Sequence, residues 1–420
     1  MKKDKTFVMA SGMLFTTTLI ASAINYVYHF LMGRMLGPAE YGIIGALFSV
    51  IYFIGATLNT VQTVAAKFVS VLKAKSEGSK IGWLLRRISA KMLLLGVGVS
   101  LVFVFGSTFI ADFLAMPARH VVAFSTAFTL IFVLFGMRGF LQGLQKFRSL
   151  SFSIIVESIF RLAVALGLVA LGYGVFGALI SYGVAVAFSV VFSFVPLARL
   201  WKSAEKYKIN SSEVYNYSIP VLIAMVAITA AYTLDVFLAK HFFDPVTAGH
   251  YAAAGLLSKI IFFGSVSIAQ VMFPKISEMY AAKQNYSGVF KKALAAVIGV
   301  SAAATAAYYL FPNFLVSVFF GPAYADVIPI VGPFSLAIGI LSVNFVFISY
   351  FLSLNKTGFI PFLLIFVAAE LTGIWFWHNS MQQIITIIAA AMLALLLSLV
   401  AYFFIVQSKN ENIHNNTGLQ

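Results

Sequence analysis

The residues of this sequence with the clearest chemical potential are charged side chains that lie inside, or at the ends of, long apolar stretches. A charge within a bilayer is costly, so such a residue usually faces a partner or a water-filled cavity. Eight of these charged residues are taken as candidates: Arg34, Arg138, Glu157, Arg161, Asp235, Lys240, Lys259 and Glu370. The chemistry open to them is the binding of a charged ligand or the exchange of an ion.

Five of the eight are cations and are candidates for substrate binding: Arg34, Arg138, Arg161, Lys240 and Lys259. Arginine and lysine pair with phosphate or carboxylate groups, so this set favours an anionic cargo. A site for organic cations would instead present acids and aromatic faces. A structural interpretation stays open, in which Arg34 and Lys240 set topology or contact lipid headgroups and Arg138 extends to the membrane surface.

The three acids are candidates for ion coupling or for charge pairing. Glu157 and Arg161 are four residues apart and share one face of a helix, where they either neutralise each other or form a functional pair. Asp235 is either paired with Lys259 or a site for a proton or cation. Glu370 falls in the middle of an apolar stretch, which favours a binding or coupling role.

The composition places these residues in a membrane protein. The chain has 420 residues, of which 61% are hydrophobic and 10% are charged, whereas a soluble domain carries about 25% charged residues. Such a surface could not stay wet, so ordinary soluble enzymes, disordered chains and disulfide scaffolds are excluded. The absence of cysteine excludes thiol catalysis, cysteine-ligated zinc and iron–sulfur clusters.

Twelve apolar stretches are long enough to cross a bilayer, because a helical crossing needs about 20 mostly apolar residues. They cover residues 8–33, 43–69, 92–114, 121–142, 152–171, 175–197, 217–239, 250–273, 293–311, 327–352, 358–377 and 384–406. Most lysines and arginines between the stretches fall on the side of the N-terminus, and only Arg34, Arg119 and Lys240 fall on the other. The positive-inside rule then predicts that both termini are cytoplasmic. It also explains the net charge of +15 without a nucleic-acid partner.

Three pairs of matching segments divide the chain into two halves of six stretches. The pairs are 61–67 with 269–275, 109–118 with 314–323, and 140–146 with 351–356. We expect an all-α polytopic membrane protein with twelve transmembrane helices in two six-helix lobes related by a parallel repeat. The predicted lobes are 1–204 and 205–406, and the predicted cytoplasmic tail is 407–420.

The sequence also predicts how the protein is powered. The phosphate-binding pattern Gly-x4-Gly-Lys does not occur, and the connections are too short for a folded extramembrane domain. We therefore predict a transporter without cofactor or metal, driven by an ion gradient, the membrane potential or the gradient of its own substrate. A membrane-embedded enzyme is disfavoured because no long outer loop is present.

Two motifs resemble those of a known family. Residues 34–42 (Arg-Met-Leu-Gly-Pro-Ala-Glu-Tyr-Gly) follow the first stretch, and residues 235–240 (Asp-Val-Phe-Leu-Ala-Lys) precede residues 248–254 (Ala-Gly-His-Tyr-Ala-Ala-Ala). Both resemble the signature of the polysaccharide and O-antigen flippases. These proteins belong to the multidrug/oligosaccharidyl-lipid/polysaccharide exporter superfamily, and the resemblance spans essentially the whole chain.

The resemblance implies a V-shaped pair of helix bundles in the cell (plasma) membrane. By alternating access, this pair would flip a polyprenyl-diphosphate-linked oligosaccharide from the cytoplasmic to the outer leaflet for surface polysaccharide biosynthesis. The implied partners are the lipid-linked oligosaccharide, membrane lipids, H⁺ or Na⁺, and a complex with a polysaccharide polymerase or glycosyltransferase. Of the candidate residues, Arg34, Asp235 and Lys240 lie in or beside the matching motifs.

Related functions remain as alternatives to this implied role. The related lipid II flippases usually carry two further C-terminal spans, so twelve spans favour a polysaccharide flippase. The alternative function on the same fold is a cation-coupled multidrug antiporter. Its lumen is expected to be rich in acids, whereas a lumen for a diphosphate cargo is expected to be basic.

Overall fold

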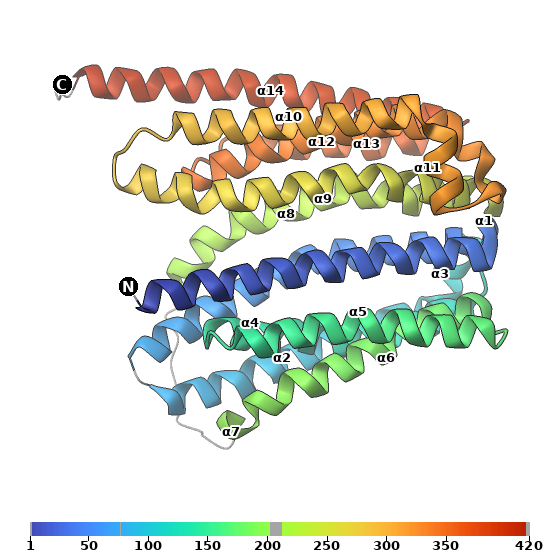
Figure 1. The fold of residues 1–420 in the computed structure, drawn as a ribbon, viewed down its shortest axis with the longest axis horizontal. Helices are drawn as coiled ribbons and strands as arrows, with labels where there is room; N and C mark the ends of the chain where they lie inside the picture. The colour runs from blue at the N-terminus through green and yellow to red at the C-terminus, as the bar shows by residue number, and fades with distance from the viewer. Residues whose placement is uncertain (1, 76, 202–211, 417–420) are drawn as a thin grey trace. The chain divides into compact units, whose positions relative to one another are not determined.

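The computed structural model describes residues 2–75, 77–201 and 212–416, and every regular element within these ranges is helical (Figure 1). The helices are α1 (Lys2–Ala74), α2 (Gly78–Phe105), α3 (Ser107–Phe113), α4 (Ala118–Gly143), α5 (Phe147–Ala170), α6 (Gly174–Phe194), η1 (Val195–Leu197), α7 (Ala198–Trp201), α8 (Ser212–Phe242), α9 (Pro245–Ala281), α10 (Ser287–Leu310), α11 (Pro312–Phe319), η2 (Pro322–Val327), α12 (Ile328–Ser353), α13 (Ile360–Phe376) and α14 (Met381–Asn416). The predicted lobe boundary at residues 204 and 205 lies outside the described residues. So do the last four residues of the predicted tail.

Ten helical segments of the described chain are long and apolar enough to cross a membrane. The first, Thr16–Lys73, has 58 residues and contains two of the predicted crossings. They meet at Gly37, whose φ of 76° and ψ of 174° interrupt the helix just before Pro38. The eleventh predicted crossing is α13, an apolar helix of 17 residues. All twelve predicted stretches are therefore helical, and the predicted fold class is confirmed.

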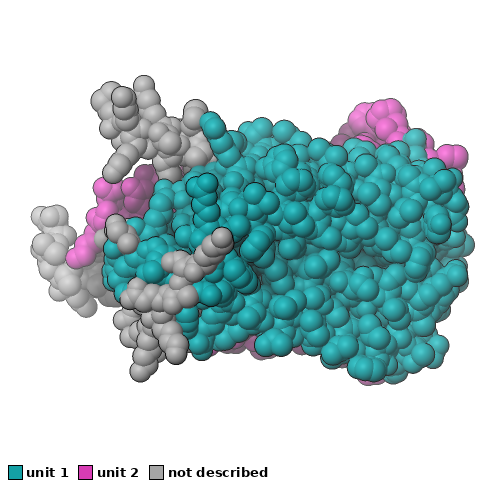
Figure 2. Space-filling model, turned by 90° about the horizontal axis from the view of Figure 1, so that it is seen from below, with its two compact units in different colours: residues 1–218, 244–249 teal, residues 219–243, 250–420 magenta. Residues whose placement is uncertain are grey.

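The chain forms two compact units (Figure 2). Unit 1 contains Met1–Ser218 and Asp244–Gly249, and unit 2 contains Ile219–Phe243 and His250–Gln420. In unit 1 the helices α1, α4, α5 and α6 all contact one another, and α2 packs on α4. In unit 2, α12 contacts both α10 and α14, and α13 contacts α14. Each unit is thus a helix bundle that buries its own side chains.

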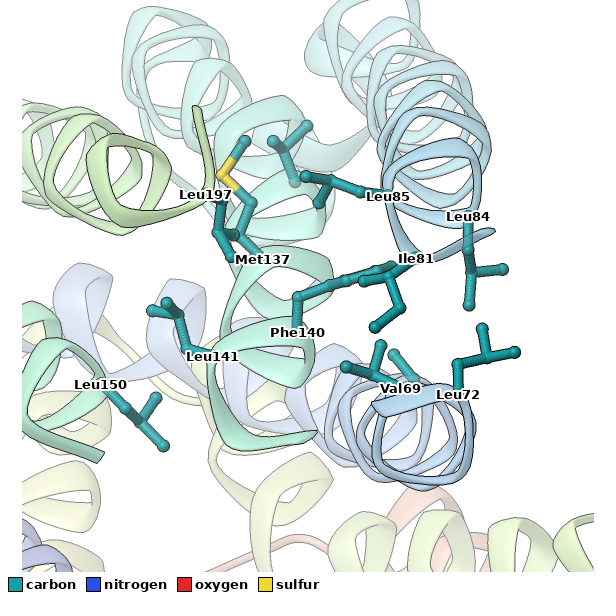
Figure 3. Packing of buried hydrophobic residues seen from close by; sticks show 12 residues of the cluster. Val69, Leu72, Ile81, Leu84, Leu85, Met137, Phe140, Leu141, Leu150 and Leu197 are labelled. Carbon is teal, nitrogen blue, oxygen red and sulfur yellow. The ribbon is translucent and has the colours of Figure 1, made fainter. Parts of the chain in front are cut away.

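A cluster of hydrophobic side chains, most of them from α1, α2 and α4, is a core of unit 1 (Figure 3). Val69 of α1, Leu84 of α2 and Phe140 of α4 are all fully buried within it. Close approach of α4 to α1 depends on Gly139, because a β-carbon there would lie 2.7 Å from the carbonyl oxygen of Gln62. Small residues of this kind allow membrane helices to pack backbone against backbone.

The repeat predicted from sequence has a counterpart in the backbone. Helices α4 and α12 each have 26 residues and end in the same way. In α4, Gln145 has a φ of 59° and the Lys146 amide donates to the Leu141 carbonyl at 2.8 Å. In α12, Asn355 has a φ of 55° and the Lys356 amide donates to the Phe351 carbonyl at 2.9 Å. Both helices end in a left-handed cap of the Schellman type. The next long helix, α5 in one half and α13 in the other, therefore follows the same kind of cap.

Candidate functional site

The first candidate site is an ion-pair cluster in unit 1, where Glu157 lies between two arginines. Nη2 of Arg138, on α4, donates to Oε2 of Glu157 at 2.8 Å. Nη2 of Arg161, one turn further along α5, donates to Oε1 at 3.0 Å. The three side chains are between 7% and 12% exposed. Two cations and one anion give this cluster a formal charge of +1.

Arg138 is held in place by hydroxyl and carbonyl groups of the neighbouring helices. Its Nε donates to Oγ of Ser153, and its Nη2 also donates to the carbonyl oxygen of Ser153 and to Oγ of Ser189, each at 3.1 Å. The two serine hydroxyls are themselves 2.8 Å apart. Arg138 therefore links α4, α5 and α6 instead of extending to the membrane surface, and its guanidinium has little freedom to move.

Arg161 has different surroundings, because aromatic rings replace the serines. Its Cζ lies 4.8 Å from the ring centre of Tyr182 and 6.0 Å from those of Tyr28 and Phe48. A guanidinium over an aromatic face gains a cation–π attraction. Among the described residues, Nε of Arg161 has no hydrogen-bond partner, although it is buried. Arg161 therefore has donor capacity left for a ligand.

A histidine held by two tyrosines lies next to these rings. Nδ1 of His29 is 3.3 Å from the hydroxyl of Tyr41, and Nε2 is 3.3 Å from the hydroxyl of Tyr52. The ring of His29 packs against Tyr28 and Phe48 edge to face. Tyr41 belongs to the 34–42 motif that carries the family resemblance. The motif therefore contributes one buried tyrosine, Tyr41, to the group of aromatic residues beside Arg161.

The second candidate site is a charge cluster in unit 2. Nζ of Lys259, on α9, lies 3.3 Å from Oδ1 of Asp235, on α8. The hydroxyl of Tyr251 donates to the other carboxylate oxygen, Oδ2, at 3.1 Å. Asp235 is 1% exposed, and Lys259 also lies 6.0 Å from the ring centre of Phe334. Asp235 and Lys259 therefore form an ion pair with no net charge, which agrees with one of the two interpretations of Asp235 from the sequence.

Glu370 is the third charged residue of this second cluster. It lies on α13 with no measurable exposure, and neither carboxylate oxygen has a hydrogen-bond partner among the described residues. Asp235 and Lys259 both act on it electrostatically. If Glu370 were ionised, two acids and one base would give the cluster a formal charge of −1. If it carries a proton, the cluster is neutral.

The two remaining candidates, Arg34 and Lys240, differ in burial. Each lies near the end of the first predicted crossing of its half. Arg34 is exposed on α1, three residues before Gly37. Lys240 is only 1% exposed near the end of α8. The contacts above bring together Arg138, Glu157 and Arg161 in unit 1 and, separately, Asp235 with Lys259 in unit 2.

Sequence reasoning missed the uncharged members of both sites. Ser153 and Ser189, Tyr28 and Tyr182, and Tyr251 all contact a charged candidate. The available signal was helical spacing, because Ser153 lies four residues before Glu157 on the same helix. No comparable spacing connects Tyr28 with Arg161, since they belong to different helices.

Comparison with known proteins adds a family and a fold. The model of the family described as "Polysaccharide biosynthesis protein" matches residues 8–280. A comparison with curated proteins found no match.

Solved structures with the same fold include an inward-facing multidrug resistance MATE family transporter of the MOP superfamily. It is similar over 93% of this chain and 96% of its own, with a TM-score of 0.81 and 11% identity. A MOP superfamily transporter from Pyrococcus furiosus is similar over 95% of each chain, with a TM-score of 0.69 and 12% identity. At this identity the likeness shows the fold alone.

Proposed function

The chain belongs to the polysaccharide biosynthesis protein family, and from this premise we propose that it flips a polyprenyl-diphosphate-linked oligosaccharide across the cell membrane. The movement runs from the cytoplasmic to the outer leaflet by alternating access. The cargo combines a polar glycan, an anionic diphosphate and a long apolar tail. The protein must provide a polar path only for the glycan and the diphosphate, because each unsatisfied polar group in hydrocarbon costs several kcal/mol.

The observation that carries this proposal is the +1 cluster of unit 1. Arg161 is fixed by Glu157 on one side and by the ring of Tyr182 on the other, while its Nε has no partner among the described residues. A planar guanidinium with a free N–H group suits a phosphate oxygen. In this proposal Arg161 contacts the diphosphate, and Arg138 with its serines positions Glu157 and, through it, Arg161.

The transport step needs an energy source other than nucleotide hydrolysis, since the sequence has no phosphate-binding loop. The unit 2 cluster of Asp235, Lys259 and Glu370 is the candidate for coupling to an ion gradient. The proposed protein partner is a polysaccharide polymerase or a glycosyltransferase that acts before or after the transport step.

A second candidate function is cation-coupled multidrug antiport on the same fold. It is favoured by the MATE transporter to which the chain is structurally similar. The description of the Pyrococcus furiosus transporter says that reversed polarity of its binding pocket suggests a different function for that protein. Polarity is therefore the property to weigh here, and the basic cluster of unit 1 favours an anionic cargo over a cationic drug.

Deletion of the gene in its host separates the two functions. Flipping predicts loss of surface polysaccharide together with accumulation of the lipid-linked oligosaccharide inside the cell, and mass analysis of that precursor identifies the cargo. Dye efflux measured in parallel is expected to be unchanged. Unchanged surface polysaccharide with slower dye efflux would instead establish the multidrug function. Re-expression of the wild-type chain is the control for both measurements.

A further inference from the structure

Glu157 and Glu370 lie equally far from the start of the corresponding helices in the two halves of the chain. Helix α5 begins at Phe147 and α13 begins at Ile360, so each glutamate is the eleventh residue of its helix. Both helices follow a 26-residue helix with the same left-handed cap, formed at Gln145 in one half and at Asn355 in the other. The repeat has therefore placed one buried acid on the corresponding helix of each half.

The surroundings of the two equivalent acids are opposite in character. Both carboxylate oxygens of Glu157 accept a bond from an arginine. Both oxygens of Glu370 lack a hydrogen-bond partner among the described residues, and Glu370 is the more deeply buried of the two. Lys259, the cation that acts on Glu370 electrostatically, is already paired with Asp235.

The groups that face Glu370 leave a proton as the best counter-charge. Asp235 of α8 and Lys259 of α9 act on Glu370 electrostatically, and Glu370 acts in turn on Tyr251 of α9. Helix α14, which packs on α13, has no charged residue from Met381 to Ile405. A bare carboxylate in an apolar interior is so costly that the group normally becomes neutral. A metal cation would need several oxygen ligands, yet the ammonium of Lys259 lies in the same cluster. No group of three or more His, Cys, Asp or Glu side chains is found among the described residues.

We propose that Glu370 is the proton-carrying residue of this protein, protonated in the buried state seen here. Release breaks the O–H bond of the carboxylic acid, and the proton passes to water on one side of the membrane. The carboxylate that remains then competes with Asp235 for the ammonium of Lys259. Protonation of Glu370 would thereby control the ion pair between Asp235 of α8 and Lys259 of α9, and through it the conformation of unit 2.

The protonation itself can be tested without any substrate, by infrared spectroscopy of the purified chain in lipid. At neutral pH the wild-type protein should show the C=O stretching band of a protonated carboxylic acid, which shifts in D₂O. Glu370→Gln should lose this band. Glu157→Gln, the matched change at the equivalent position, should retain it because the Glu157 carboxylate is ionised between its arginines.

Three results of this measurement would overturn the proposal: no such band in the wild type, a band that Glu370→Gln leaves unchanged, or a band that disappears on adding NaCl but not choline chloride at constant pH. The last result would assign the site to sodium. Glu370→Asp keeps the acid and should keep a band. It therefore separates loss of the proton from loss of the fold.

The coupling role of Glu370 rests on the proposed flippase function and needs a second measurement. In proteoliposomes with an internal pH dye, lipid-linked oligosaccharide should cause proton flux through the wild type, and Glu370→Gln should reduce this flux to background. If the infrared band behaves as expected but the oligosaccharide causes no proton flux in the wild type, the proposed substrate is wrong and the protonated Glu370 stands. Proton flux retained by Glu370→Gln would overturn its coupling role.

Discussion

At the scale of single residues, the two clusters illustrate two ways in which a membrane protein keeps a buried acid. Glu157 is neutralised by arginines that a network of serines holds in place. Glu370 has no such partners among the described residues. A buried ion pair is expensive to form and more expensive to break from one side. The two acids should therefore respond in opposite ways to the same substitution.

Glu157→Gln is expected to destabilise the protein by about 3 kcal/mol, because it leaves two buried guanidinium groups without their counter-charge. Glu370→Gln is expected to change stability little, since an amide replaces a group that we propose to be uncharged already. Thermal unfolding of both variants in the same detergent measures the difference. Equal loss of stability in the two variants would contradict the assignment of charge states.

Arg161→Lys and Arg138→Lys are expected to differ in what they damage. Both keep the positive charge, but lysine lacks the planar fork that stacks on rings and donates in several directions. Arg138 has four hydrogen bonds across three helices, so Arg138→Lys should lower thermal stability. Arg161→Lys should fold and lose transport, because it removes the N–H group that we assign to the diphosphate.

The measurement for this pair is surface polysaccharide in the deletion strain, normalised to the amount of protein in the membrane. Wild-type export by Arg161→Lys at normal protein level would contradict a role of Arg161 in recognising the cargo.

At the scale of helices, packing between backbones positions the charged residues. Arg138 precedes Gly139, whose close contact with α1 fixes how far α4 lies from that helix. Because a helix moves as a rigid element, a shift of α4 at Gly139 also moves Arg138 away from α5. Stability and ion-pair geometry in unit 1 are therefore linked through the close packing of α4 on α1.

Gly139→Ala is expected to destabilise unit 1 by about 1–3 kcal/mol, the usual effect of overpacking. Its β-carbon would lie 2.7 Å from the Gln62 carbonyl oxygen and 2.8 Å from the β-carbon of Ala65. Gly167→Ala in α5 is the matched control, since nothing lies within 4 Å of the added carbon. It should leave the protein as stable or slightly more stable. Thermal unfolding that ranks the two variants in the other order would refute the contact.

At the scale of the whole molecule, each unit has a charge character of its own. Unit 1 carries the basic cluster beside aromatic rings, and unit 2 carries the cluster whose charge depends on one proton. If the proposals above hold, one half of the repeat has become the anion site and the other the coupling site. The transport function needs a definite orientation in the membrane, and the sequence predicts that orientation from its lysines and arginines.

The orientation can be tested directly, because the chain has no cysteine. Gln284→Cys lies in the exposed connection between α9 and α10, and Tyr173→Cys lies in the exposed connection between α5 and α6. In intact cells a membrane-impermeant thiol reagent should label Tyr173→Cys and leave Gln284→Cys unlabelled until the cells are opened. The reverse pattern would place the termini outside.

An all-helical membrane protein with a six-plus-six repeat could be predicted from the amino-acid sequence alone. Hydrocarbon leaves the backbone of an apolar stretch no partner but itself, so length and composition suffice to predict each helix. Spacing along one helix likewise indicated the Glu157–Arg161 pair, since residues four apart share a face. A break in the helix near Gly37 could also be predicted, because residues 8–33 and 43–69 were assigned to separate crossings.

Which charged residues meet across helices could not be predicted from the sequence, because it depends on how the helices pack. The bond from Arg138 to Glu157 joins α4 to α5, and the isolation of Glu370 depends on what α8, α9 and α14 present to α13. A soluble helix reveals its inner face by an apolar stripe, but these helices are apolar all round. The rotation of each helix, and with it the partner of each buried charge, is therefore set by packing contacts such as those of Gly139.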